Sequence, residues 1–220
     1  MMRKDLLVVN FKAYSESSGE HAVALSKIAE SVSKKTGIPV ILAVQSTDIA
    51  LITSSVQIPV FAQHVDPNLP GAKTGSVTIE SVTQAGACGS ILNHSEKRLD
   101  LIVLKDTLAH ARNAGFPILL CAKDAAEAKS FSLLNPDFIA IEPPELIGGN
   151  VSVSTARPNV ISDGVKAVGG IPLLVGAGIK TQEDVRIAKK LGARGILVAS
   201  GVVLANNPKK VLLDLARGFE

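Results

Sequence analysis

The chain has 220 residues, of which 46% are hydrophobic and 20% charged, and its formal net charge is +3 at pH 7. This length and composition fit one globular domain, so we expect a single domain over residues 1–220. The positive charge is too small and too dispersed to indicate a nucleic-acid partner. Because no apolar run reaches the roughly 18 residues that span a bilayer and the N-terminus enters a strand pattern too early for a signal peptide, we expect a soluble, cytoplasmic protein without a membrane partner.

Short runs rich in β-branched residues alternate along the chain with longer helical patterns. In chain order, strands are predicted at LLVVN (6–10), PVILA (39–43), a run led by IPV (58–60), GACGSIL (86–92), a run led by FPI (116–118), FIAIE (138–142), a run led by IPL (171–173) and GARGILV (192–198). Four of these strands start with proline, whose missing N–H matters least at the first strand residue. Gly86 and Gly192 suit left-handed C-caps of preceding helices, and the first helix is predicted over residues 20–35.

This alternation predicts parallel strands joined by crossover helices. The strands are apolar at successive positions, as expected where both faces are buried, and Cys88 and Cys121 in two of them are predicted to be buried thiols. Eight βα units favour a closed (β/α)8 TIM barrel over an open doubly wound sheet. No strand reads as a hydrophilic edge, and no Gly-x-Gly-x-x-Gly motif follows the first strand. In such a barrel the chemistry lies at the C-terminal ends of the strands.

Polar residues end the first and fourth strands. NFK places Asn10 and Lys12 side by side on one face of an extended segment, where both can point into the barrel mouth. The alternative for Lys12 is a strand-end lysine that extends its charge into solvent. His94, in NHSEKR, is followed by a run that can open a helical turn, whose N-terminus would favour a neutral imidazole that donates from its other nitrogen. The alternative is a hydrogen-bonded structural histidine.

Glu142 ends the sixth strand, within IEPPELIGG. Pro143 and Pro144 would stiffen one hinge and Gly148 and Gly149 would loosen another, so the residues between them can swing as a lid. Closure would then desolvate the carboxylate. The alternative is that Glu142 only caps the loop.

Small residues end the last two strands, in VGAG (175–178) and ASG (199–201). Backbone N–H groups of such turns can approach an anion closely, and the loops after strands seven and eight of a barrel commonly hold phosphate. The alternative is two plain turns. The pairing of the two segments on neighbouring strands favours a phosphate site.

The motifs NFK, NHSEKR, IEPPELIGG, VGAGIK and LVASGVV, in this order and at strand ends, resemble those of triosephosphate isomerases, and the short chain resembles the archaeal branch of that family. The resemblance runs from Asn10 to about Ala205. It implies interconversion of D-glyceraldehyde 3-phosphate and dihydroxyacetone phosphate through an enediolate, in glycolysis and gluconeogenesis, with no metal or other cofactor.

The resemblance also assigns roles by position. It implies that Glu142 is the general base, that His94 is the electrophile, and that Lys12 and Asn10 are electrostatic partners of the substrate oxygens. The residues implied to contact the substrate or its phosphate are Ile147, Gly178, Ala199 and Ser200. The chain departs from the commoner bacterial and eukaryotic pattern at three places. Asn93 replaces a glycine before the histidine, and Leu146 or one of its neighbours replaces a tryptophan in the lid. Gly176-Ala177-Gly178 replaces a Gly-Gly-Ser sequence, so backbone N–H groups must do more of the phosphate binding.

Residues 66–78 follow the third strand and read on their own as a solvated loop. The GAKTG motif within them looks like the family loop that inserts into a neighbouring subunit near its active site. The resemblance therefore implies a homo-oligomer, either a homotetramer, as the archaeal branch suggests, or a dimer.

Two other interpretations stay open on the sequence. Another phosphate-binding barrel enzyme, such as one from tryptophan or thiamine biosynthesis, would share the two phosphate loops but not NFK and NHSEKR together. A non-catalytic phosphosugar-binding protein would keep the phosphate loops and lose the base or the electrophile.

Overall fold

The computed structural model describes residues 5–143 and 158–220. Its strands are β1 (Leu6–Asn10), β2 (Val40–Val44), β3 (Val60–Ala62), β4 (Ser90–Leu92), β5 (Ile118–Ala122), β6 (Phe138–Ile141), β7 (Leu173–Val175) and β8 (Gly195–Val198). Each strand pairs in parallel with the next, and β8 pairs with β1 to close the barrel. The predicted TIM barrel is confirmed.

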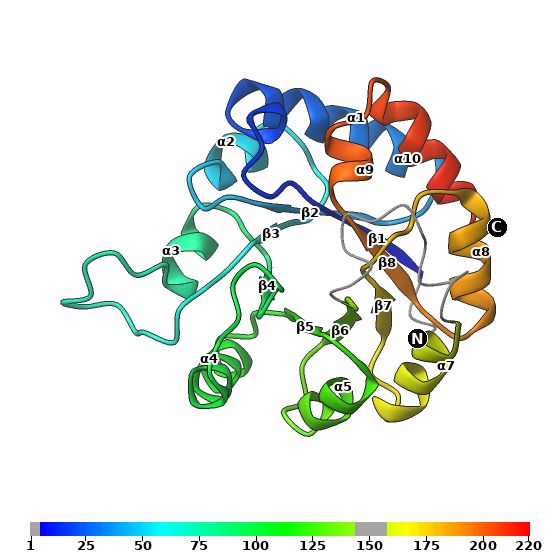
Figure 1. The fold of residues 1–220 in the computed structure, drawn as a ribbon. Helices are drawn as coiled ribbons and strands as arrows, with labels where there is room; N and C mark the ends of the chain where they lie inside the picture. Colours follow the sequence, from blue (N-terminus) through cyan, green and yellow to red (C-terminus); the bar gives the residue numbers. More distant parts are fainter. Residues whose placement is uncertain (1–4, 144–157) are drawn as a thin grey trace.

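Helices lie outside the ring of strands (Figure 1). They are α1 (Glu20–Thr36), α2 (Ile49–Thr53), α3 (Ile79–Gln84), α4 (Leu101–Asn113), α5 (Ala125–Ser132), α7 (Pro158–Ala167), α8 (Gln182–Lys190), α9 (Ser200–Val203) and α10 (Pro208–Arg217), with a short 3-10 helix at Ser15–Ser17. Within the described ranges, no helix is both long enough and apolar enough to cross a membrane.

The proline-led strands begin one residue later than predicted. Pro39 and Pro59, for example, directly precede β2 and β3. Their carbonyls nevertheless accept hydrogen bonds from the neighbouring strands, at 3.0 Å from Leu7 N and 3.0 Å from Leu42 N. Proline lacks the N–H but keeps the acceptor, so it extends the sheet on one side only.

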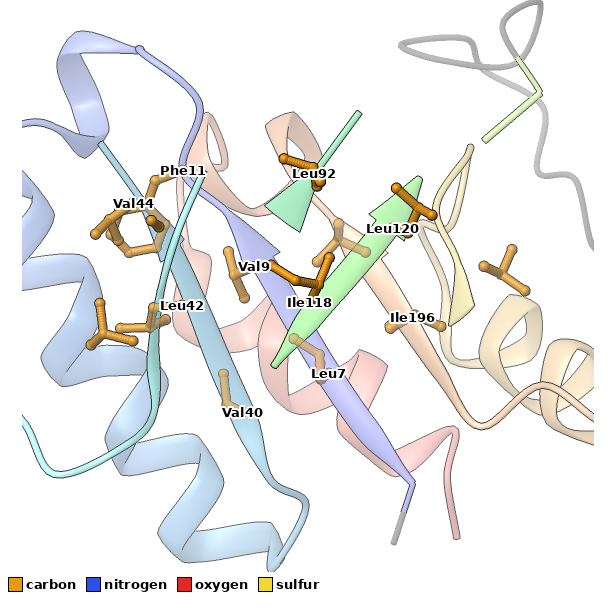
Figure 2. Close-up of a cluster of buried hydrophobic side chains, with 14 of the residues drawn as sticks. Leu7, Val9, Phe11, Val40, Leu42, Val44, Leu92, Ile118, Leu120 and Ile196 are labelled. Carbon is orange, nitrogen blue, oxygen red and sulfur yellow. The ribbon is translucent and has the colours of Figure 1, made fainter. Parts of the chain in front are cut away.

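The strand residues form two apolar clusters, as their alternation requires. One cluster consists of strand residues from all eight strands and contains no helix residue, so it fills the inside of the barrel: Leu6, Val8, Ile41, Ala43, Phe61, Ile91, Leu119, Cys121, Ala140, Leu174 and Leu197. The intervening residues pack outward against the helices, and Figure 2 shows part of this outer cluster, including Leu7, Val9 and Leu42. Both faces of the strands are therefore buried, as predicted.

The inward face turns polar at the C-terminal ends of the strands. In β1 the inward residues Leu6 and Val8 lead to Asn10, and in β6 the inward residue Ala140 leads to Glu142. Asn10 and Glu142 are both buried despite their polarity. The alternation of strand residues thus carries polar groups into the barrel mouth.

The prediction of two buried thiols is half right. Cys121 is buried inside the barrel, whereas Cys88 is exposed. Cys88 precedes β4 at the N-terminal end of the barrel, where its N–H donates to Val60 O at 2.9 Å, and it belongs to neither apolar cluster.

Candidate active site

A cavity of about 200 Å³ lies among the residues that end or follow the strands. It is lined by seven of the eight residues to which the resemblance assigns a role: Asn10, Lys12, His94, Glu142, Gly178, Ala199 and Ser200. These residues come from the ends of β1, β4, β6, β7 and β8, so the barrel brings together groups that are far apart in the chain. Ile147 and the hinge residues Pro144, Gly148 and Gly149 lie outside the described residues.

Lys12 reaches the cavity by a different route from the one predicted. It is not part of an extended segment, because β1 ends at Asn10 and Lys12 has a left-handed backbone with φ 50°. Its N–H donates to Asn10 Oδ1 at 3.0 Å, and its Nζ lies 2.6 Å from Glu96 Oε1. The Lys12 side chain is only 14% exposed, so it is not a lysine that extends into solvent.

Gln63, after β3, is a site residue that the sequence reasoning missed. Its Nε2 lies 3.1 Å from Asn10 Oδ1, 2.9 Å from Lys12 O and 3.2 Å from Ala43 O. The amide therefore holds the two polar residues of the NFK motif from the end of β3, across the intervening strand β2. The sequence could have indicated Gln63, because it stands two residues after the inward-facing Phe61 and therefore faces inward as well. The same alternation places Asn10 two residues after Val8.

The hydrogen bond at His94 Nδ1 suits a ring that carries its proton on Nε2. The backbone N–H of Glu96 donates to His94 Nδ1 at 3.2 Å, so Nδ1 serves as an acceptor. The following residues form one turn, with Lys97 N–H donating to His94 O at 2.8 Å, and α4 begins only at Leu101. One backbone N–H in a turn thus replaces the expected helix N-terminus. His94 Nε2 lies 3.3 Å from Glu142 Oε1.

Glu142 is a buried carboxylate, 4% exposed, at the point where β6 ends. Its N–H donates to Ala122 O at 2.9 Å, which ties it to the end of β5. Its Oε2 is buried and has no hydrogen-bond partner among residues 5–143 and 158–220. Burial raises the pKa of the Cys121 thiol well above its usual range, and the carboxylate of Glu142 raises it further, so a protonated thiol lies beside the carboxylate.

Gly176 makes room for that carboxylate. A Cβ atom at Gly176 would lie 2.5 Å from Glu142 Cγ. The sequence suggested Gly176 only as part of a phosphate-binding turn. In the structure it also sets the space in which the Glu142 side chain lies.

These groups suit proton transfer next to a carbonyl. Glu142 offers a buried carboxylate oxygen, His94 an N–H, and Lys12 a cation, all facing one cavity. In such a water-poor site, fixed donors stabilise a developing oxyanion far better than they would in bulk water. Among the described residues, no group of three or more His, Cys, Asp or Glu side chains could hold a metal ion.

A statistical model of the triosephosphate isomerase family matches residues 5–217. This chain belongs to the triosephosphate isomerase family. A relative named triosephosphate isomerase from Methanopyrus kandleri is 46% identical over the whole of both chains. Another of that name, from Saccharolobus solfataricus, is 45% identical over 97% of this chain and 95% of its own, and one from Methanobrevibacter smithii is 42% identical over 97% and 98%.

The triosephosphate isomerase family accounts for the order of motifs along the chain, and its archaeal members cover this chain almost end to end. The predicted resemblance to the archaeal branch is therefore confirmed. The alternative of another phosphate-binding barrel family is excluded, because the family match spans nearly all the strands and helices rather than the phosphate loops alone.

Proposed function

We propose that this chain interconverts D-glyceraldehyde 3-phosphate and dihydroxyacetone phosphate, as an intramolecular aldose-ketose isomerase of glycolysis and gluconeogenesis in the cytoplasm. The observation that carries the proposal is the pairing of Glu142 and His94. A buried carboxylate and a neutral imidazole lie 3.3 Å apart, and the Lys12 ammonium lines the same cavity. Family membership supports the same reaction.

In the proposed mechanism Glu142 removes the proton from the carbon beside the substrate carbonyl. The Nε2–H of His94 and the ammonium of Lys12 donate to the oxygen that gains negative charge as the enediolate forms. The carboxylic acid of Glu142 then returns the proton to the neighbouring carbon. A second proton passes from one substrate oxygen to the other, with His94 as the group that would carry it, so that the carbonyl and the hydroxyl exchange places. This division of labour between a glutamate base and a neutral histidine is the one known for triosephosphate isomerases themselves. Asn10, held by Gln63, would contact the substrate oxygens beside Lys12.

The substrate phosphate is proposed to bind at the loops after β7 and β8. Gly178, Ala199 and Ser200 line the cavity on that side. Gly178 has φ 68°, a conformation in which glycine lets the backbone approach an anion without a side chain in the way. Ile147 is proposed to contact substrate from the lid segment, whose closure would exclude water and protect the enediolate from losing its phosphate.

We further propose a homo-oligomer, a homotetramer or a dimer, assembled through the loop of residues 66–78. Figure 1 shows this loop reaching away from the barrel between β3 and α3. Residues 69–75 of this loop are exposed, and the apolar residue Leu69 among them has 65% of its surface exposed. A second hollow of about 260 Å³, lined in part by Lys12, Gln63 and Glu96, offers a place for the same loop of a neighbouring subunit. A loop docked there would lie against the active site.

Turnover of glyceraldehyde 3-phosphate, coupled to reduction of dihydroxyacetone phosphate, tests the proposed reaction. The wild-type protein should turn over, and Glu142→Asp should lower kcat by about 10²- to 10³-fold, because the shorter side chain withdraws the base by ~1 Å. Binding of a phosphate-bearing inhibitor should change little and serves as the control. A Glu142→Asp protein with near-normal kcat would remove Glu142 from the role of base.

A further inference from the structure

Asn93 ends β4 in an unusual conformation. It is 1% exposed and has φ 60°, the left-handed region that non-glycine residues seldom occupy. Both ends of its side-chain amide are bonded. Nδ2 donates to Cys121 O at 3.0 Å, and Oδ1 accepts from the Leu99 N–H at 2.9 Å.

The backbone conformation alone does not require an asparagine. Glycine adopts a positive φ without strain, whereas a buried amide must have partners for its donors and acceptor or it destabilises the fold. The Asn93 amide has such partners on two different segments, the strand β5 and the loop that ends at Leu99. The side chain therefore serves to join those segments.

The loop that Asn93 closes contains the electrophile. The bond from Leu99 N–H to Asn93 Oδ1 spans His94 and Glu96, so it fixes the turn in which Glu96 N–H donates to His94 Nδ1. Arg98, in the same loop, donates to Asn93 O at 3.4 Å and forms an ion pair with Glu127 on α5. The turn is thus held at both of its ends.

The other bond reaches the strand beside the base. Cys121 lies inside the barrel, and its thiol is close enough to the Glu142 carboxylate for that charge to raise the pKa of the thiol. By bonding Cys121 O, Asn93 ties the His94 turn to the strand that borders Glu142. The 3.3 Å separation between His94 Nε2 and Glu142 Oε1 depends on the relative placement of these two segments.

We infer that Asn93 is a positioning residue of the isomerisation, which holds the His94 turn against β5 so that Nδ1 receives the Glu96 N–H and the Nε2–H faces the reacting oxygen. This inference rests on the proposed function. Asn93 acts through His94 and does not touch the substrate, because it does not line the cavity. The rate of proton transfer should therefore depend on it more than substrate affinity does.

Asn93→Gly tests this role, because glycine keeps the positive φ and removes only the amide. Asn135→Gly is the matched control, since Asn135 is also left-handed, with φ 53°, but is exposed and lies between α5 and β6, at the opposite end of the barrel. We expect Asn93→Gly to lower kcat by about 10- to 10²-fold, the order expected for misplacing a catalytic group by up to 1 Å, with KM within about twofold of wild type. Asn135→Gly should leave both constants unchanged.

A second readout follows the ring itself. The ¹⁵N NMR signals of the imidazoles, with His94→Gln used to identify the His94 pair among the four histidines, report which ring nitrogen carries the proton. Wild type should show the neutral form with the proton on Nε2, and Asn93→Gly should show a mixture of the two neutral forms. Asn93→Asp keeps the acceptor for Leu99 N–H, and it provides the same readouts if the glycine variant does not fold.

Unchanged kcat and unchanged His94 signals in a folded Asn93→Gly or Asn93→Asp protein would overturn the inference. So would a loss of kcat without any change in the His94 signals, because that would show a purely structural effect. If wild type shows no isomerase turnover while the signals still shift in the variant, the proposed function fails but the control of the His94 ring by Asn93 stands. The two proposals can thus fail separately.

Discussion

Polar side chains differ in burial and hydrogen bonding between the two ends of the barrel. At the N-terminal end, exposed Asp137 accepts the Ile118 N–H at 2.9 Å and Arg112 donates to Leu134 O at 2.7 Å, so side chains close the loops there with ordinary bonds to the backbone. At the C-terminal end, Glu142 is buried with one oxygen unpartnered among the described residues. Burial without full hydrogen bonding costs free energy, so keeping Glu142 in the barrel mouth lowers stability there, as is common at functional sites.

Left-handed backbone at non-glycine residues occurs at both ends of the barrel but serves a different purpose at each. In the described part of the chain, three non-glycine residues have a positive φ: Lys12, Asn93 and Asn135. Lys12 and Asn93 lie at the barrel mouth, where Gln63 and Asn93's own amide supply the bonds that hold the conformation. Asn135 lies in the loop between α5 and β6, where it serves only a turn. The same conformation therefore supports a site at one end and a loop at the other.

The substitution expected to have the largest effect at the C-terminal end of the barrel is Gly176→Ala. The added methyl would lie 2.5 Å from Glu142 Cγ and must push the carboxylate away from the cavity. We expect kcat to fall by about 10²-fold or more, because ~1 Å of displacement of the base suffices for that loss. The wild-type protein is the reference in the coupled assay, and a Gly176→Ala protein with an unchanged kcat would contradict the assigned role of Gly176.

Lys12→Met tests the charge at the mouth. Methionine keeps much of the apolar stem, so the fold should survive, while the lost charge-assisted contact should cost ~1.5–3 kcal/mol of transition-state stabilisation. We expect kcat/KM to fall by at least roughly 10- to 10²-fold.

An alkylammonium ion should restore part of the activity of Lys12→Gly if the charge itself matters. Two results together would show that Lys12 is a surface lysine without a role in the reaction. The Lys12→Met protein would be fully active, and the Lys12→Gly protein would bind a phosphate inhibitor normally and would not be rescued.

At the N-terminal end of the barrel, Asn135→Ala should lower the free energy of unfolding and leave kcat/KM unchanged. Alanine lacks the local hydrogen bonding that lets asparagine adopt φ 53°, so the free energy of unfolding should fall by about 1 kcal/mol. Urea unfolding measures this change, and kcat/KM in the coupled assay should match wild type. A drop in activity without a drop in stability would show that the two ends are coupled.

The smallest expected effect concerns the reactivity of the two cysteine thiols. Cys88 is an exposed residue, but partial burial of its sulfur raises the pKa of the thiol, and full burial together with Glu142 raises the pKa of Cys121 further. A thiol reagent at pH 8 should therefore modify Cys88 slowly in the folded protein and reach Cys121 only on unfolding. Mass spectrometry of labelled peptides checks this order, with Cys88→Ser as the control. Rapid labelling of Cys121 in the native state would show that the barrel mouth opens to solvent.

Several parts of the fold and the site could be predicted because their causes are local. The positive φ of Gly86 and Gly192, 102° and 99°, follows from where each glycine stands after a helix. The first helix was predicted within one residue of its observed end at Thr36. His94 and Glu142 could be singled out because polar residues directly after apolar strands are unusual, and the cavity contains both.

Other features depend on neighbours that are distant in the chain. The turn at Lys12 needs Gln63, which lies 51 residues further along, to bind its carbonyl. The exposure of Cys88 depends on what surrounds the barrel end before β4 rather than on the apolar segment in which the residue stands. Neither could be deduced from the surrounding residues.

The sequence by itself determined the alternation of strands and helices, the burial of both strand faces and the residue types that end each strand, because these depend on periodicity and on backbone propensities of a few adjacent residues. Only the tertiary structure decided which of those ends meet and how closely. The 3.3 Å between His94 and Glu142, the space that Gly176 leaves, and the bond from Asn93 to Cys121 all arise when parallel strands close in one register. Contacts across that closed sheet join residues dozens of positions apart, and no local pattern encodes their distance.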